Sequence, residues 1–287
     1  ALLSGVLFAI HPIHVQAVSW ITEGVELTGA LFYFLAFYFL ISGESFFRRG
    51  FSVIFFCFAL CGKEMVVSFP FVVLAWGFLW KGKRGHLLLK LVLPYFLLLI
   101  IYASARLLFY YLPVTSYYNP SRVLRNPVEV IRDLVSIGAN FIYLFAPIYN
   151  PLDILRIKYP DHPNLLGYFT DPIVLFEVFY LGVSLLLILV ALHLALRRKE
   201  GRRLGAFSLV WIGITMLPVL HVMANLGGGW YMYIPSFGAC LLWPWLIESA
   251  LKKIGQDKGR QYLVRQGTTL VTGALIVLFI TSMVWEN

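Results

Sequence analysis

Charged residues are scarce in this chain of 287 residues: Asp, Glu, Lys and Arg make up only 13% of it, and the mean hydropathy is +0.81. This composition excludes an ordinary soluble domain and is typical of a protein that crosses a membrane several times. The three cysteines all lie in or beside apolar runs, so no disulfide framework is expected. A secretory leader is not recognisable either. We expect a fragment that lacks its true N-terminus and continues beyond its last residue.

Long apolar runs, by contrast, fill most of the chain. We expect residues 1–287 to form one all-α domain, a polytopic membrane bundle with about nine or ten segments near or below the ~20 residues that a bilayer needs. The candidate spans are residues 1–12, 27–42, 51–62, 65–80, 91–112, 173–196, 205–222, 231–250 and 267–285.

The net charge of +9 is concentrated in four short loops between these runs. They hold sixteen of the 23 basic residues: Arg48 and Arg49; Lys81, Lys83, Arg84 and Lys90; Arg197, Arg198, Lys199, Arg202 and Arg203; and Lys252, Lys253, Lys258, Arg260 and Arg265. Because these basic residues are divided among several loops, they indicate membrane topology rather than a nucleic-acid-binding surface. The positive-inside rule places the four loops in the cytoplasm. Alternation then places residues 11–26, 63–64, 113–172, 223–230 and 286–287 on the outer face, if the apolar segment 127–149 re-enters or lies along the interface.

Proline is concentrated in the outer segment 113–172, which holds eight of the 14 prolines. This density excludes a long straight helix and favours a shaped loop over a cavity. Asp153 and Arg156 lie in this segment. Together they can grip an anionic head group, or they can belong to an ordinary polar loop.

Ionisable residues interrupt the apolar runs on the predicted outer face. His11 and His14 are spaced to share a helix face, where they can position a substrate, remain solvated, or hold a metal if further ligands exist. Glu23 and Glu26 have the same spacing, and paired carboxylates can divide into a base and an orienting group. Solvated acids at a helix N-terminus are the alternative interpretation.

Lys63 and Glu64 interrupt a long apolar run, and intramembrane charge is costly enough to indicate function. Lys63 can hold a phosphate that Glu64 orients, or the two can form the tip of a helical hairpin. Tyr231 and Tyr233 follow three glycines at the mouth of another run. They can be interface anchors or can flank a sugar.

Three of these motifs, in chain order, resemble the transmembrane and tetratricopeptide-repeat O-mannosyltransferases and their bacterial relatives, which have the GT-C architecture. Residues 8–21, followed by Glu23, Glu26 and Leu27, are similar to the family's F-A-x-H-P-x-H-x-E-x-V-x-W-I-x-x-R-x-D-x-L, and residues 63–70 match its K-E/P-M-x-V-x-x-P. Residues 231–242 match its Y-L-Y-L-P-S-x-G-x-C-L-L, and residues 145–160 are similar to a further loop region.

The resemblance implies a GT-C-like enzyme that moves a hexose, usually mannose, from a polyprenyl-phosphate carrier to a Ser or Thr hydroxyl of a protein. The reaction is expected on the periplasmic face of a bacterial inner membrane or the lumenal face of the endoplasmic reticulum. The lipid-linked sugar phosphate is the expected donor, without a cofactor. Because the sequence has no strong metal motif, no metal is expected. A tetratricopeptide-repeat domain is expected to follow on the same side.

Within this mechanism a carboxylate, with Glu26 and Glu23 as candidates, deprotonates the acceptor. The leaving phosphate needs cations. The candidates for it are Lys63, Arg106 and Arg156. Residues expected to position the donor or the base are His11, His14, Glu64, Asp153, Tyr231 and Tyr233.

The chain departs from the family pattern at three places. Gly24 replaces an Arg, Gln16 replaces a Glu, and Gly229-Trp230 replace Glu-Arg. The acidic pair of the family's first outer loop would precede Ala1, so we expect this fragment to lack the main base.

Two other functional classes fit the same residues. A transporter or flippase for a lipid-linked sugar would use the cavity without breaking a bond, although no internal repeat is evident and the polar groups sit at one mouth. A catalytically inactive membrane anchor for a repeat domain is the other class, which the missing arginines favour.

Overall fold

A computed structural model describes residues 2–19, 24–80, 82, 85–111, 144–145, 202–219 and 229–254, and individual residues at 182, 186, 189, 193, 269–270, 273–274, 276–277 and 280. Most residues of the predicted spans 173–196 and 267–285, and all but Leu144 and Phe145 of the proline-rich segment 113–172, lie outside the described residues.

Helices account for all the regular structure of the described residues, and no strand occurs among them. The α-helices are α1 (Leu2–Ala9), α2 (His14–Ser19), α3 (Gly24–Ile41), α4 (Phe46–Leu60), α5 (Phe69–Leu79), α6 (His86–Tyr111), α11 (Arg202–Met216) and α13 (Tyr233–Ile254). Short 3-10 helices are η2 (Glu64–Ser68), η4 (Leu217–Val219) and η5 (Gly229–Met232). The all-α prediction is therefore confirmed for this part of the chain.

Polar and ring-constrained residues set several of these helix ends. Ser45 caps α4 by accepting a hydrogen bond from the Arg48 backbone N–H. Pro12 lies between α1 and α2, and Pro70 sits in the first turn of α5, where a missing N–H costs least. The predicted spans 51–62 and 65–80 correspond to α4 and to η2 with α5, and Lys63 lies in the connection between them, as at the tip of a helical hairpin.

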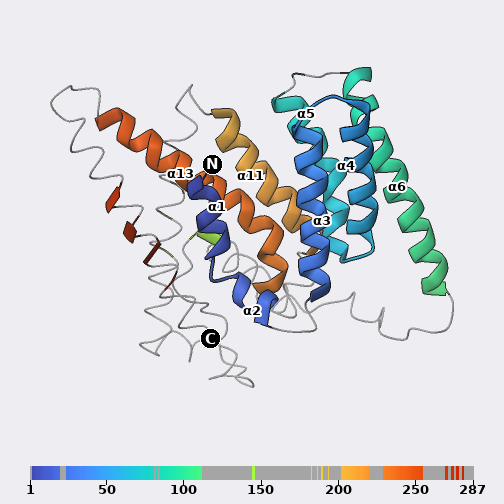
Figure 1. Cartoon of the computed structure of the whole chain (residues 1–287), viewed down its shortest axis with the longest axis horizontal. Helices are drawn as coiled ribbons and strands as arrows, with labels where there is room; N and C mark the ends of the chain where they lie inside the picture. The colour runs from blue at the N-terminus through green and yellow to red at the C-terminus, as the bar shows by residue number, and fades with distance from the viewer. Residues whose placement is uncertain are drawn as a thin grey trace.

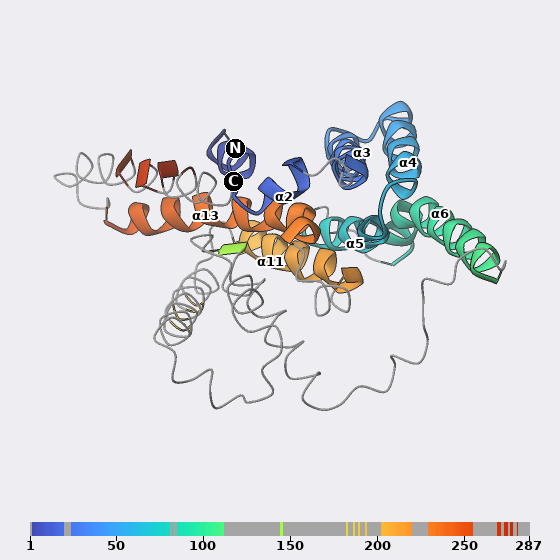
Figure 2. The same cartoon turned by 90° about the horizontal axis from the view of Figure 1, so that it is seen from below.

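The helices pack as two groups in contact. In Figure 2, α13, α11, α5 and α6 form one row, and α1, α2, α3 and α4 lie along one side of it. The main contacts join α3 to α4, α11 to both α13 and α5, α5 to α6, and α1 to α13.

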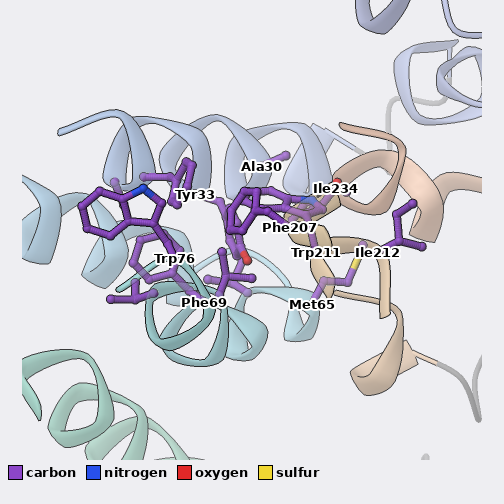
Figure 3. Close-up of a cluster of buried hydrophobic side chains, with 14 of the residues drawn as sticks. Ala30, Tyr33, Met65, Phe69, Trp76, Phe207, Trp211, Ile212 and Ile234 are labelled. Atoms are coloured by element: carbon purple, nitrogen blue, oxygen red, sulfur yellow. Dashed lines mark hydrogen bonds between the residues drawn. The ribbon is translucent and has the colours of Figure 1, made fainter. Parts of the chain in front are cut away.

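Aromatic side chains fill the space between α3, α5 and α11 (Figure 3). The Trp211 ring lies 5.1 Å from Phe37 and 5.7 Å from Tyr33, measured between centroids. Its indole N–H donates to the Ile234 carbonyl at 2.9 Å, which ties α11 to α13. Buried tryptophan keeps its polar edge satisfied in this way while its faces pack against the neighbouring rings.

Two of the described helices, Gly24–Ile41 and His86–Leu108, are long and apolar enough to cross a membrane. The α6 helix turns much of its apolar surface outward. Its exposed large side chains are Leu87, Leu89, Leu93, Leu97, Ile100, Ile101, Leu107 and Leu108. A helix in the core of a soluble domain would bury such a surface, so this pattern is consistent with a membrane protein.

Candidate functional site

Polar residues from three separate motifs meet at one end of the helix bundle. The start of α3, the end of α4 and the start of α13 all lie toward α2 at the lower end of Figure 1. The α3–α4 connection, the start of α6 and the start of α11 lie at the opposite end. The starts of α4, α6 and α11, which carry Arg48, Arg49, Lys90 and Arg203, therefore lie at the end of the bundle opposite the polar motifs.

A buried ion pair forms the centre of this cluster. The Lys63 Nζ lies 2.5 Å from Glu26 Oε1, and the Glu26 side chain is only 2% exposed, against 22% for Lys63. A carboxylate taken out of water is stable only when an opposite charge or hydrogen bonds compensate it. Lys63 supplies that charge and keeps part of its own surface accessible.

The absence of a side chain at Gly62 allows the chain to make this pair. Gly62 immediately precedes Lys63, and a Cβ added to it would lie 2.8 Å from the Gly29 Cα on α3. The backbones of α3 and the α4–η2 connection therefore touch here without any intervening side chain. Because Gly29 lies about one helical turn beyond Glu26, this contact sets Lys63 next to the Glu26 carboxylate.

An aromatic ring lies on another side of the Lys63 ammonium. The Lys63 Nζ is 5.1 Å from the centroid of the Tyr231 ring, within the range of a cation–π interaction. Tyr231 belongs to η5, so the cluster joins a residue of α3, the residue before η2 and a residue of η5. Lys63 is therefore a cation held on two sides, by a carboxylate and by a ring face.

The His14 ring ties α2 to α13 beside this cluster. Its Nε2 is hydrogen-bonded to the Ser236 Oγ at 2.8 Å, and Ser236 in turn donates to the Tyr233 carbonyl at 2.7 Å. The ring also lies 4.2 Å from the Tyr233 ring, centroid to centroid. Burial lowers the pKa of His14, so the ring is neutral near pH 7.

The His14–Ser236 bond predicts a measurable coupling. His14→Ala and Ser236→Ala should each destabilise the protein, and their double-mutant cycle should give a coupling energy of about 1 kcal/mol, as for a buried neutral hydrogen bond. Thermal unfolding in detergent micelles measures it. Ser208→Ala is the matched control, since the buried Ser208 hydroxyl bonds within α11 to the Leu204 carbonyl. Additivity of His14→Ala with Ser236→Ala would contradict this coupling.

The His11 ring, unlike that of His14, is hydrogen-bonded to backbone groups through both of its nitrogens. Its Nδ1 accepts the Ile13 backbone N–H at 3.3 Å, so the ring proton resides on Nε2, which donates to the Leu144 carbonyl at 3.1 Å. The next carbonyl, that of Phe145, accepts the indole N–H of Trp243 at 3.0 Å. Two adjacent carbonyls of the segment predicted to re-enter are thus bound by side chains of distant elements.

Of the remaining predicted site residues, Arg106 lies away from this cluster. Arg106 is exposed near the end of α6, where its guanidinium lies 2.8 Å from the Tyr102 hydroxyl, and both views show that end extending away from α2 and α13 (Figures 1 and 2). Glu64 begins η2 directly after Lys63. Glu23, Asp153 and Arg156 lie outside the described residues. Within the described ranges, no three His, Cys, Asp or Glu residues gather as a metal site would require.

Sequence reasoning did not single out Gly29, Gly62 or Ser236. The run Cys-Gly-Lys-Glu at 61–64 contained a signal for Gly62, because a glycine next to a charge in an apolar run is typical of a close backbone approach. Ser236 belongs to the matched motif at 231–242 but carries no signal for its partner, and Gly29 carries none, since both contacts are with residues distant in the chain. Comparisons with protein-family models, with curated proteins and with solved structures find no match to this chain.

Proposed function

We propose that this protein is a polytopic, GT-C-like membrane glycosyltransferase with about nine or ten membrane segments. It moves a hexose from a polyprenyl-phosphate carrier to a protein hydroxyl on the outer or lumenal face. The observation that supports the proposal most directly is the cluster of Lys63, Glu26 and Tyr231, which draws on each of the three regions that resemble the family.

Lys63 is the residue to which we assign the donor phosphate. Its ammonium is partly exposed, while the buried Glu26 carboxylate keeps it charged in apolar surroundings. A cation held in this way stabilises the negative charge that develops as the bond between the sugar C1 and the phosphate oxygen breaks. The electron pair of that bond leaves with the lipid phosphate.

Glu26 has an orienting role in this proposal. Its carboxylate is paired to Lys63 at 2.5 Å and is almost fully buried, so its negative charge serves to position and retain the ammonium. The acceptor hydroxyl attacks C1 and gives its proton to a different carboxylate, which we do not assign to a described residue. Tyr231 and Tyr233 offer ring faces and hydroxyls of the kind that sugars contact.

The outward-facing apolar surface of α6 supports the membrane part of the proposal. A row of exposed leucines and isoleucines along this helix matches a hydrocarbon environment better than water. The basic helix ends opposite the cluster support an outer location for it, because cytoplasmic loops are enriched in Lys and Arg.

Sugar transfer from a radiolabelled polyprenyl-phosphate hexose tests the function. The full-length protein in membranes is compared with the double variant Glu26→Gln/Lys63→Met, which removes both charges and leaves no unpaired charge behind. We expect wild type to label protein, with mannose or glucose as the sugar, and the double variant to lose about 100-fold in rate while remaining folded. Loss of one stabilising charged donor typically has an effect of that size.

Each outcome of this experiment decides a part of the proposal. Unchanged transfer by the double variant would remove the ion pair from the site. No transfer by folded wild type from either donor would overturn the glycosyltransferase function. In that case, retention of the lipid-linked sugar by wild type and its loss in the double variant would indicate a transporter instead.

A further inference from the structure

Two large aromatic side chains are exposed at the start of α4. Phe46 is 86% exposed and Phe47 is 77% exposed, the highest values among the exposed phenylalanines of the described residues. They open α4 at the end of the bundle opposite the Lys63 cluster (Figure 1). Exposing two consecutive phenylalanines to water is unfavourable, so this surface is expected to be covered by something partly apolar.

Two arginines follow these rings directly. The Arg48 guanidinium donates to the Ser42 carbonyl, which holds the side chain across the connection. The Arg49 guanidinium lies 3.9 Å from the Glu44 carboxylate, and the two side chains are 46% and 56% exposed. Such an exposed pair is weak, so Arg49 can exchange Glu44 for a stronger anionic partner at little cost.

Neighbouring helices present the same combination at this end. Trp80, just after α5, is 38% exposed, and Lys90 in the second turn of α6 is exposed as well. Aromatic rings beside basic groups match a membrane boundary, where the rings occupy the head-group level and cations meet the lipid phosphates. Charge complementarity then favours lipids of net negative charge.

We propose that Phe46, Phe47, Arg48 and Arg49 form a binding surface for the head group of an anionic phospholipid, here named the α4 lipid surface. The rings enter the boundary between head groups and acyl chains, and the arginines bind the phosphate. A planar guanidinium suits this task because it can donate two parallel hydrogen bonds to one phosphate. The inference rests on the membrane location in the proposed function and is independent of sugar transfer.

Native mass spectrometry of the full chain in mixed micelles of phosphatidylglycerol and phosphatidylcholine tests this surface. We expect wild type to retain phosphatidylglycerol in excess over its share of the micelle. Arg48→Gln/Arg49→Gln should reduce that enrichment about fivefold or more, since each basic residue near an anionic surface contributes about a factor of five. Glu44→Gln, which removes the competing carboxylate, should raise it.

Two further variants serve as controls. Arg106→Gln removes an exposed arginine from the other end of α6 and should leave the enrichment unchanged. Arg48→Lys/Arg49→Lys keeps both positive charges and should retain most of the phosphatidylglycerol enrichment. Enrichment that survives in Arg48→Gln/Arg49→Gln, or that falls equally in Arg106→Gln, would overturn the α4 lipid surface.

The membrane location itself is tested separately by alkaline carbonate extraction of the same proteins from membranes. Wild type and all variants should stay in the membrane pellet, because their apolar helices are unchanged. Release of wild type into the supernatant would overturn both the membrane location and the lipid surface, whereas the absence of sugar transfer would affect neither.

Discussion

Lys63→Met is expected to lower the free energy of unfolding by about 3 kcal/mol, because it leaves the Glu26 carboxylate without its opposite charge. The Glu26 side chain is 2% exposed, so water cannot replace the missing ammonium. Removing one partner of a buried pair typically costs about 3–5 kcal/mol, and the partial exposure of Lys63 places this case at the lower end. Unfolding in detergent, followed by circular dichroism, measures the change.

The double variant Glu26→Gln/Lys63→Met should recover most of this loss, because no charge then remains buried. Arg49→Gln is the matched control on the exposed pair with Glu44, and it should change stability by less than about 0.5 kcal/mol. If Lys63→Met and Arg49→Gln cost the same, the Glu26–Lys63 pair would not be a buried one.

Gly62→Ala is expected to cost about 2 kcal/mol of stability and to separate Lys63 from Glu26. The added Cβ would lie 2.8 Å from the Gly29 Cα, and a backbone atom cannot rotate away as a flexible side chain can. The α4–η2 connection therefore has to move away from α3, which lengthens the distance between the two charges. Thermal unfolding measures the first effect.

A double-mutant cycle measures the second effect of Gly62→Ala. In its background, Lys63→Met should cost less than in wild type, because the pair is already weakened. Gly29→Ala is the matched control: its Cβ would meet nothing closer than the Lys63 backbone nitrogen at 3.4 Å, an ordinary contact. If Lys63→Met costs as much stability in the Gly62→Ala and Gly29→Ala backgrounds as in wild type, the contact at Gly62 does not position Lys63.

The helices of the described residues were largely predictable, because the apolar runs that produce them are long. The predicted run 27–42 corresponds to α3 (Gly24–Ile41), and 231–250 corresponds to α13 (Tyr233–Ile254). The largest differences are at the ends of runs. Residues 51–62 were predicted as one span, yet α4 begins at Phe46, where Ser45 provides a cap that hydropathy does not register.

The candidate site was predictable only in part. Charges inside apolar runs identified Glu26 and Lys63 as unusual, but not as partners, because they are far apart in the sequence. His11 and His14 share a spacing that suggested a common role. In the fold their rings lie 5.5 Å apart, centroid to centroid, yet they bind different partners, Leu144 and Ser236. His11 lies in the turn before α2, whereas His14 is the first residue of that helix.

The sequence by itself determined the helical class, the approximate helix positions and the separation of basic helix ends from polar motifs. These depend on hydrophobicity and charge along short stretches, which act locally. Tertiary structure alone decided that Lys63 pairs with Glu26 above Tyr231, and that His14 bonds to Ser236. Such contacts depend on how closely two backbones approach, and at Gly29 and Gly62 that distance follows from helix packing rather than from any local pattern.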